Sequence, residues 1–218
     1  MPYTTTTLTI SDIVDAALED VEAKSINFPA SAEQVSHAAK TLQRMLKSWQ
    51  NEEGVPDFLI ASQTVTATTS AAYTLSPSRP QEILTATVKQ NGIEIPMIPL
   101  SRQDYDRLPD KDATGLPTQF HYDRQREDGT FYVWPVFASV SGETFEITYE
   151  RDFENITSTT TNVDVPGEWW DAVVLGLASR LCHTYGSEAA KQRLPFEAER
   201  AFRVALGNVT AGEVVRFC

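Results

Sequence analysis

Residues 165–186 read VPGEWWDAVVLGLASRLCHTYG, and this stretch decides how the rest of the chain is arranged. Pro166 and Gly167 come before a helical pattern that runs from Glu168 to about Tyr185, and Gly186 ends it. Apolar side chains nearly encircle this helix: Trp169, Val173, Val174, Leu177 and Leu181. A helix that is apolar all round is packed among other elements. We therefore expect residues 168–185 to form the most buried helix of the protein.

Three further helices are predicted, two of them at the other end of the chain. The first has Ser11 as its cap, ahead of an apolar stripe that begins at Ile13. The second begins at Ser31, with Gln34 as its capping-box partner. The last carries Pro195 near its first turn and ends at Gly207. We expect the helices from both chain ends to pack together.

The middle of the chain, from about residue 58 to 151, shows the alternation of β-strands. VKQNGIEI at 88–95 predicts a hairpin with a two-residue Asn91–Gly92 turn. Its register places Lys89 opposite Glu94 and Val88 opposite Ile95. A second hairpin turns near residues 127–129, and FEITYER at 145–151 forms another strand. All of these strands are expected to be antiparallel.

These patterns predict an α+β protein. Its helical bundle is built from both chain ends, with two N-terminal and two C-terminal helices, and an antiparallel β-sheet or small barrel or sandwich is inserted between them. Prolines at 77, 80, 96, 99, 109, 117 and 135 favour short, irregular strands. The predicted division is an N-terminal helical half at 1–55, the β insertion at 56–155, a C-terminal helical half at 156–207 that packs on the first, and a tail at 208–218.

The chain is acidic, with 18 Lys and Arg against 30 Asp and Glu among 218 residues, a net charge of -12. This sign disfavours tight binding of nucleic acid. The imbalance is uneven, because residues 1–55 carry 8 acids and 4 bases whereas residues 156–218 carry 7 and 6. No apolar run reaches the roughly 18 residues of a membrane span. The beginning, MPYTTTTLTI, lacks the features of a secretory signal, so we expect synthesis in the cytosol.

Motifs of catalysis and of cofactor or metal binding are missing from the sequence, so no catalytic, cofactor-binding or metal-ligating residue is predicted. The string DKDATG at 110–115 opens like a calcium loop, but its twelfth position is His121 instead of the bidentate glutamate. A solvated turn is therefore the favoured interpretation. Cys182 and His183 are adjacent on a helix and point about 100° apart, which favours a buried thiol over a catalytic pair.

Five strings in a fixed order carry a resemblance to a known family: MLKSW at 45–49, YTLSPSRPQEI at 73–83, LPTQFHYD at 116–123, FYVWPVF at 131–137 and VPGEWWDAVVLGLASRLCHTYG at 165–186. In this order they resemble the head-to-tail adaptor proteins of short-tailed bacteriophages, also called head-completion or tail accessory proteins. The resemblance extends over most of the chain, roughly from Leu8 to Leu206.

The resemblance implies a structural protein without enzymatic activity. It would be a monomer alone and would form a ring of about twelve copies beneath the portal protein after DNA packaging. The ring would extend the DNA channel and receive the next tail component, such as a nozzle, knob or needle. DNA would pass through without specific binding, and no membrane would be involved. The resemblance places the protein in the neck or tail of the virion, after synthesis in the host cytoplasm.

The resemblance also implies that the helical part lies against its neighbours in the ring and that the C-terminal segment docks on the portal. The segment after Gly207, NVTAGEVVRFC, is short. Val214, Val215 and Phe217 offer an apolar strip, with Arg216 as a charged handle. One expectation is that this tail becomes ordered on contact with the portal, and the alternative of equal weight is a frayed chain end. Acidic residues would line the channel and repel DNA, which eases its passage.

Two other classes of function remain open. One is a phage-derived carbohydrate-active (cell-wall) hydrolase or binding domain that uses a pair of carboxylates about 5–9 Å apart. Glu52 and Glu53 are adjacent acids, although a solvated surface explains them as well. The other is a binding module that forms no ring. Measuring mass with and without the portal distinguishes the adaptor from both alternatives, and an assay on peptidoglycan detects the hydrolase.

Overall fold

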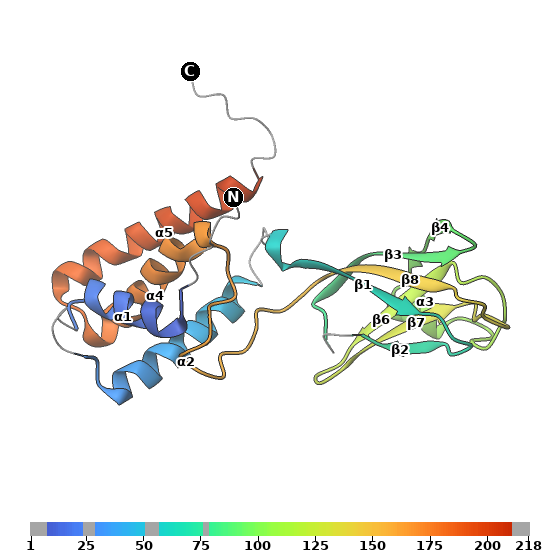
Figure 1. The fold of residues 1–218 in the computed structure, drawn as a ribbon, viewed down its shortest axis with the longest axis horizontal. Helices are drawn as coiled ribbons and strands as arrows, with labels where there is room; N and C mark the ends of the chain where they lie inside the picture. Colours follow the sequence, from blue (N-terminus) through green and yellow to red (C-terminus); the bar gives the residue numbers. More distant parts are fainter. Residues whose placement is uncertain (1–7, 24–28, 51–56, 76–78, 211–218) are drawn as a thin grey trace, which may run out of the picture. The chain divides into compact units, whose positions relative to one another are not determined.

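The computed structural model describes residues 8–23, 29–50, 57–75 and 79–210 (Figure 1). The chain divides into two compact units, one made of residues 1–58 and 153–218 and the other of residues 59–152. The first unit is helical and the second is built of strands, with helices at both ends of the chain. The predicted α+β class is therefore confirmed.

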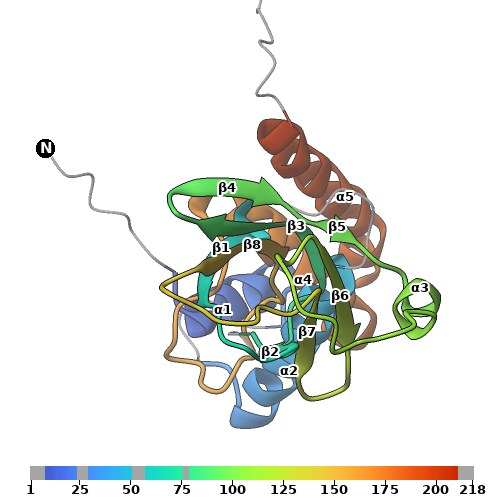
Figure 2. The same cartoon turned by 90° about the vertical axis from the view of Figure 1, so that its right-hand side faces the viewer.

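Helix α4 lies at the centre of the helical unit. The helices of this unit are α1 (Ile10–Asp20), α2 (Ala32–Trp49), α4 (Trp170–Tyr185) and α5 (Glu188–Thr210), with 3-10 turns at Asp57–Leu59 and Gly167–Trp169. α4 contacts each of the other three helices, and Figures 1 and 2 show it between α1 and α5. Val173, Leu177 and Leu181 of α4 are fully buried. The predicted packing of helices from both chain ends is confirmed.

Capping boxes begin both N-terminal helices. At α2 the Gln34 N–H donates to the Ser31 hydroxyl at 3.2 Å, and the Ser31 N–H donates to the Gln34 amide oxygen at 2.9 Å, as predicted. At α1 the prediction of Ser11 as the cap is wrong. The cap is Thr9, whose N–H donates to the Asp12 carboxylate at 2.9 Å while its hydroxyl accepts from the Asp12 N–H at 3.2 Å. Asp12 stands three residues after Thr9, which is the spacing that such a reciprocal box requires.

Helix α5 is longer than predicted at both ends. It begins at Glu188, with the Ser187 hydroxyl accepting from the Ala190 N–H at 3.2 Å, so Pro195 lies inside the helix and not in its first turn. The helix also continues past Gly207 to Thr210. Ala190, Leu194 and Ala205 are buried on one side of α5. Their burial outweighs the missing N–H of the proline and the roughly 1 kcal/mol propensity cost of the glycine.

The second unit is a sandwich of two four-stranded sheets. One sheet has the order β1 (Ile60–Thr66), β8 (Thr144–Glu150), β3 (Glu82–Gln90), β4 (Ile93–Pro96). The other has the order β2 (Ala72–Thr74), β7 (Gly129–Trp134), β6 (Gln119–Arg124), β5 (Ile98–Pro99). A single cluster of buried side chains from both sheets forms the core, with Phe131 and Phe145 fully buried in it. Alternate residues of β7 and β8 therefore face the core.

Both predicted hairpins are present. In the β3–β4 hairpin Lys89 pairs with Glu94 and Val88 with Ile95, which confirms the predicted register. The turn residues Asn91 and Gly92 have φ values of 53° and 78°, the left-handed conformation that a two-residue hairpin needs. Antiparallel pairing of β6 with β7 confirms the second hairpin.

One strand pair contradicts the expectation of purely antiparallel pairing. Ile98 and Pro99 of β5 run parallel to Gln119 and Phe120 of β6. The chain between them contains a short helix, α3 (Arg102–Asp106), and does not form a hairpin. A long connection with a helix is what parallel pairing requires, and no local turn signal could indicate it.

Candidate interaction surfaces

Helix α5 presents apolar side chains to solvent. Phe196 is 75% exposed and Val204 is 57% exposed. Together with Glu199, Arg200 and Arg203 they line an open hollow of about 370 Å³. We call these five residues the α5 face. Residues 196, 200 and 204 are spaced by four, so they form one stripe along the helix. Exposed apolar side chains that share one stripe are a feature of surfaces that bind other proteins.

The α5 face carries a surplus of positive charge. Arg203 forms an ion pair with Glu199, which leaves the Arg200 guanidinium as the excess charge of the face. A second hollow of about 190 Å³ adjoins it, shares Glu199, and adds Arg180 of α4 to the same side of the unit. In a chain with a net charge of -12, three arginines around one glutamate make a local basic surface.

Helix α1 presents the opposite charge. Asp12, Asp15 and Glu19 lie at helical spacing on one side, and Glu22 follows in the turn after the helix. We call these four residues the α1 face. Three of them are exposed and Asp15 is half-buried. Residues 10–20 contain no lysine or arginine. Hydrogen bonds from Thr9 lower the pKa of Asp12, so this carboxylate stays charged well into acid conditions.

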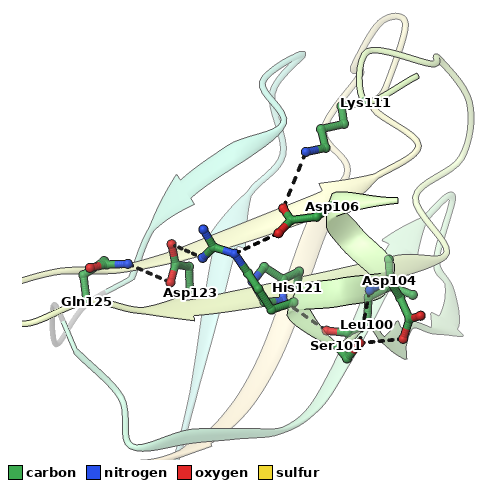
Figure 3. A network of polar contacts seen from close by, with 9 residues as sticks. Leu100, Ser101, Asp104, Asp106, Lys111, His121, Asp123 and Gln125 are labelled. Carbon is green, nitrogen blue, oxygen red and sulfur yellow. Dashed lines mark hydrogen bonds and ion pairs between the residues drawn. The ribbon is translucent and has the colours of Figure 1, made fainter. Parts of the chain in front are cut away.

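A polar network fastens α3 to the outer side of the sandwich (Figure 3). The Arg102 guanidinium pairs with Asp123 of β6 at 2.9 Å and with Asp106 at 3.4 Å. Gln125 donates to Asp123 at 2.8 Å and lowers the pKa of that carboxyl, and Arg102 acts in the same direction. Lys111 lies 3.7 Å from Asp106. These partly exposed pairs fix the position of α3 more than they add stability.

His121 lies beneath α3 and completes this attachment. It is 7% exposed, and the ring of Tyr105 stacks on it with centroids 5.2 Å apart. Its Nδ1 lies 3.0 Å from the carbonyl oxygen of Leu100, which only accepts hydrogen bonds, so Nδ1 carries the proton. Nε2 is buried and has no hydrogen-bond partner among the described residues. A histidine that packs against Tyr105 and donates one bond is a structural group of the α3 attachment.

Two carboxylates lie opposite each other on neighbouring strands of the β1–β8–β3–β4 sheet. Glu82 of β3 and Glu150 of β8 are partners in the strand register. Burial raises the pKa of Glu150 above its ordinary value, and the charge of Glu82 adds to the effect. Like charges directly opposite each other in a sheet are destabilising.

Replacing Glu150 by glutamine is therefore expected to raise the free energy of unfolding at neutral pH by about 0.2–1 kcal/mol. The pKa of Glu150 is higher in the folded than in the unfolded protein, so the charged carboxylate destabilises the fold and protonation removes this effect. The advantage of the variant should therefore shrink as pH falls through the raised pKa, and vanish below the ordinary value of 4.5. Urea unfolding of both proteins at neutral pH and near pH 4 measures this.

Glu146→Gln is the matched control, because Glu146 lies on the same strand and pairs with Lys89 at 3.5 Å. This change should leave stability unaltered or lower it slightly. Lower stability of the Glu150→Gln variant at neutral pH would contradict the repulsion.

The candidates considered for chemistry from the sequence do not assemble into a site. In the DKDATG string the Asp110 carboxylate accepts from the Asp112 N–H at 3.0 Å, as in a solvated turn, while His121 packs under α3. The Cys182 thiol is buried and donates to the Ser179 carbonyl at 3.0 Å, and burial raises its pKa. His183 is exposed. Within the described ranges, no three His, Cys, Asp or Glu side chains gather where a metal ion could be held.

Two sequence candidates lie outside the described residues. They are the adjacent acids Glu52 and Glu53, and the docking residues Val214, Val215, Arg216 and Phe217 of the tail. In the part of the chain that is described, no helix has the length and apolar character needed to cross a bilayer.

The sequence analysis missed the α5 face. In the sequence Phe196 is one of the apolar residues of this helix, together with Ala201, Phe202, Ala205 and Leu206. Phe196 lies with Val204 on a second stripe, separate from the buried Leu194 and Ala205. The signal was present, because residues 194 and 196 are about 200° apart around a helix.

Exposed apolar side chains beside charged ones, on a unit with a well-packed interior, are features of surfaces that bind other proteins. The family model described as SU10 adaptor protein matches residues 8–216. The chain belongs to this family, and it is a bacteriophage adaptor protein. No curated protein matches the chain. The resemblance to phage head-to-tail adaptors is confirmed.

Proposed function

We propose that this adaptor assembles as a ring of about twelve copies beneath the portal after DNA packaging. The ring extends the DNA channel and provides the attachment site for the next tail component, a nozzle, knob or needle. The single observation that supports this proposal is the match to the SU10 adaptor family over residues 8–216. The protein then acts as a structural part of the virion neck, without an enzymatic role.

Electron microscopy of purified portal rings incubated with the protein tests the proposal. An added annulus beneath the portal, with copy number given by the mass of the complex, is the expected result. The protein alone should have the mass of a monomer. A portal that stays bare at saturating protein overturns the proposal. An assay on purified peptidoglycan tests the alternative, in which the chain is a cell-wall hydrolase or binding domain.

We also propose a division of roles along the chain. The helical halves at 1–55 and 156–207 form the part that meets neighbouring copies, with the β insertion at 56–155 as a separate part. The exposed Phe196 and Val204 on α5 support this contact of the helices with neighbouring copies, because exposed apolar side chains are common in surfaces that bind other proteins. The tail at 208–218, with Val214, Val215, Arg216 and Phe217, docks on the portal.

Deleting residues 208–218 is expected to weaken binding to portal rings by at least about tenfold, because apolar anchors supply much of the affinity of such contacts. Co-sedimentation with portal rings at several concentrations measures this. The triple substitution Val214→Ser, Val215→Ser, Phe217→Ser in the full chain should have the same effect, whereas Arg216→Lys should keep most of the binding. Undiminished binding of the shortened chain would show that the tail does not dock.

The net charge of the chain supports a channel that does not bind DNA. A net charge of -12 on every copy gives the ring a strongly negative character, which repels the phosphates of DNA. DNA then passes through the channel without being held. A structure of the ring with a neutral or basic bore would remove this part of the proposal.

A further inference from the structure

We propose that the α5 face of one copy docks on the α1 face of the next copy around the ring. This inference rests on the proposed function, because it names the two surfaces through which neighbouring copies meet. The occupant of the exposed α5 face is thus a second copy of this chain.

Charge complementarity is the first argument. The α5 face has a net positive charge, since Arg200 and Arg203 outnumber Glu199, and Arg180 reinforces it from α4. The α1 face is wholly acidic, and α1 itself contains no base. Every copy carries both surfaces, so each α5 face would find an opposite charge on its neighbour. Opposite charges across an interface select the partner and set its orientation.

The placement of the two helices is the second argument. α1 and α5 both pack on α4 (Figure 1), and the Arg193 guanidinium of α5 also donates to the Asp20 carbonyl at the end of α1 at 3.4 Å. The two faces are made of different residues on different helices, so a contact between them joins two different surfaces of the chain. A ring requires a contact of this kind, in which one surface of a copy meets a different surface of the next. A contact between two α5 faces would instead produce a closed pair.

The apolar side chains complete the argument. Phe196 and Val204 expose apolar surface to water in the single chain. A neighbouring copy that covers them would remove this surface from water, which favours the contact. On α1 the small residue Ala16 lies between Asp15 and Glu19, and it is half-buried. An aromatic ring and a valine can approach the helix closely beside such a residue. An apolar centre surrounded by charged pairs is the usual composition of a protein interface.

A charge-swap experiment tests the inference. The first variant carries Arg200→Glu and Arg203→Glu on the α5 face. The second carries Asp15→Lys and Glu19→Lys on the α1 face, and leaves Asp12 in place because it caps the helix. Each variant alone brings like charges together, and ring formation on the portal should fall at least about tenfold. Circular dichroism establishes that each variant is folded.

Mixing the two variants is the decisive measurement. In an alternating ring every contact joins either two original faces or two reversed faces, so opposite charges meet at each one. Equal amounts of the two variants should recover most of the portal-bound mass of the original protein. The matched control is Arg124→Glu with Arg126→Glu, an equal change of net charge on exposed residues of the β unit, which should assemble normally.

The outcomes separate this inference from the proposed function. If the original protein forms no ring on the portal, the proposed function fails. If it forms a ring and the reversed variants still assemble alone, or if mixing restores nothing, the α1–α5 contact is wrong while the adaptor ring stands. Loss of binding without rescue by mixing would assign the α5 face to the portal or to another partner. Recovery on mixing supports the contact.

Discussion

Replacing Trp169 by alanine is expected to lower the free energy of unfolding of the helical unit by about 3–5 kcal/mol. Trp169 is fully buried, and its ring lies 6.2 Å from that of Trp49, 5.6 Å from that of Phe58 and 5.7 Å from that of Phe202. These neighbours come from α2, from the 3-10 turn at 57–59 and from α5. The cavity would therefore open where separate parts of the chain meet, and denaturant unfolding followed by far-ultraviolet circular dichroism would measure the loss.

Trp169→Phe is the matched control. The indole Nε1 of Trp169 is buried and has no hydrogen-bond partner among the described residues, so phenylalanine gives up no hydrogen bond. An aromatic ring of smaller size keeps most of the contacts and leaves a smaller cavity, so the loss should be clearly less than that of the alanine variant. If the phenylalanine variant were as unstable as the alanine variant, the account of Trp169 as a purely apolar centre would be wrong.

Replacing Phe131 by alanine should have an effect of similar size in the β unit, about 3–5 kcal/mol. Phe131 of β7 is fully buried between the sheets, with ring centroids 5.3 Å from Phe120 and 5.9 Å from Phe145. Its removal would take away contacts on both sides of the sandwich. Hydrogen exchange of the β8 amides should speed up, since opening of this core becomes easier.

The adjacent residue provides the comparison for Phe131. Tyr132 points to the other side of β7, where its ring lies 5.1 Å from that of Tyr105 on α3. Tyr132→Ala should therefore loosen the attachment of α3 and cost clearly less than Phe131→Ala. Equal losses at both positions would contradict the alternation of core and outer side chains along this strand.

Local signals made much of the fold predictable from the sequence. An Asn–Gly turn determines its hairpin register because few residues adopt the left-handed conformation, and Lys89 indeed faces Glu94. The Ser31–Gln34 box was equally readable, since both partners are three residues apart in the chain. Each of these features depends on only a few neighbouring residues.

Other features depend on residues far apart in the chain, and these were not predictable. The beginning of α5 is stabilised by burial of Ala190 and Leu194, which outweighs the presence of Pro195. The parallel pairing of β5 with β6 follows from where the chain returns after α3. Neither outcome leaves a mark in the local pattern of residues.

Candidate surfaces were harder to predict than elements. An exposed phenylalanine and a buried one look alike in sequence, so the exposure of Phe196 follows only from the packing of α4 against another side of α5. The acids of α1 were visible as a count in residues 1–55, but their position on one side of a helix was seen only in the structure. The tail residues, from Val214 to Phe217, remain a prediction of the sequence.

The two ends of the β unit, residues 59–152, lie next to each other. Its first strand pairs with its last, Ile60 opposite Glu150, and the Arg151 N–H donates to the Leu59 carbonyl at 2.8 Å. An inserted domain whose ends meet can be exchanged without altering the path of the chain that holds it. We therefore expect that a short turn or a different domain can replace residues 59–152 between Phe58 and Phe153 without unfolding the helical unit.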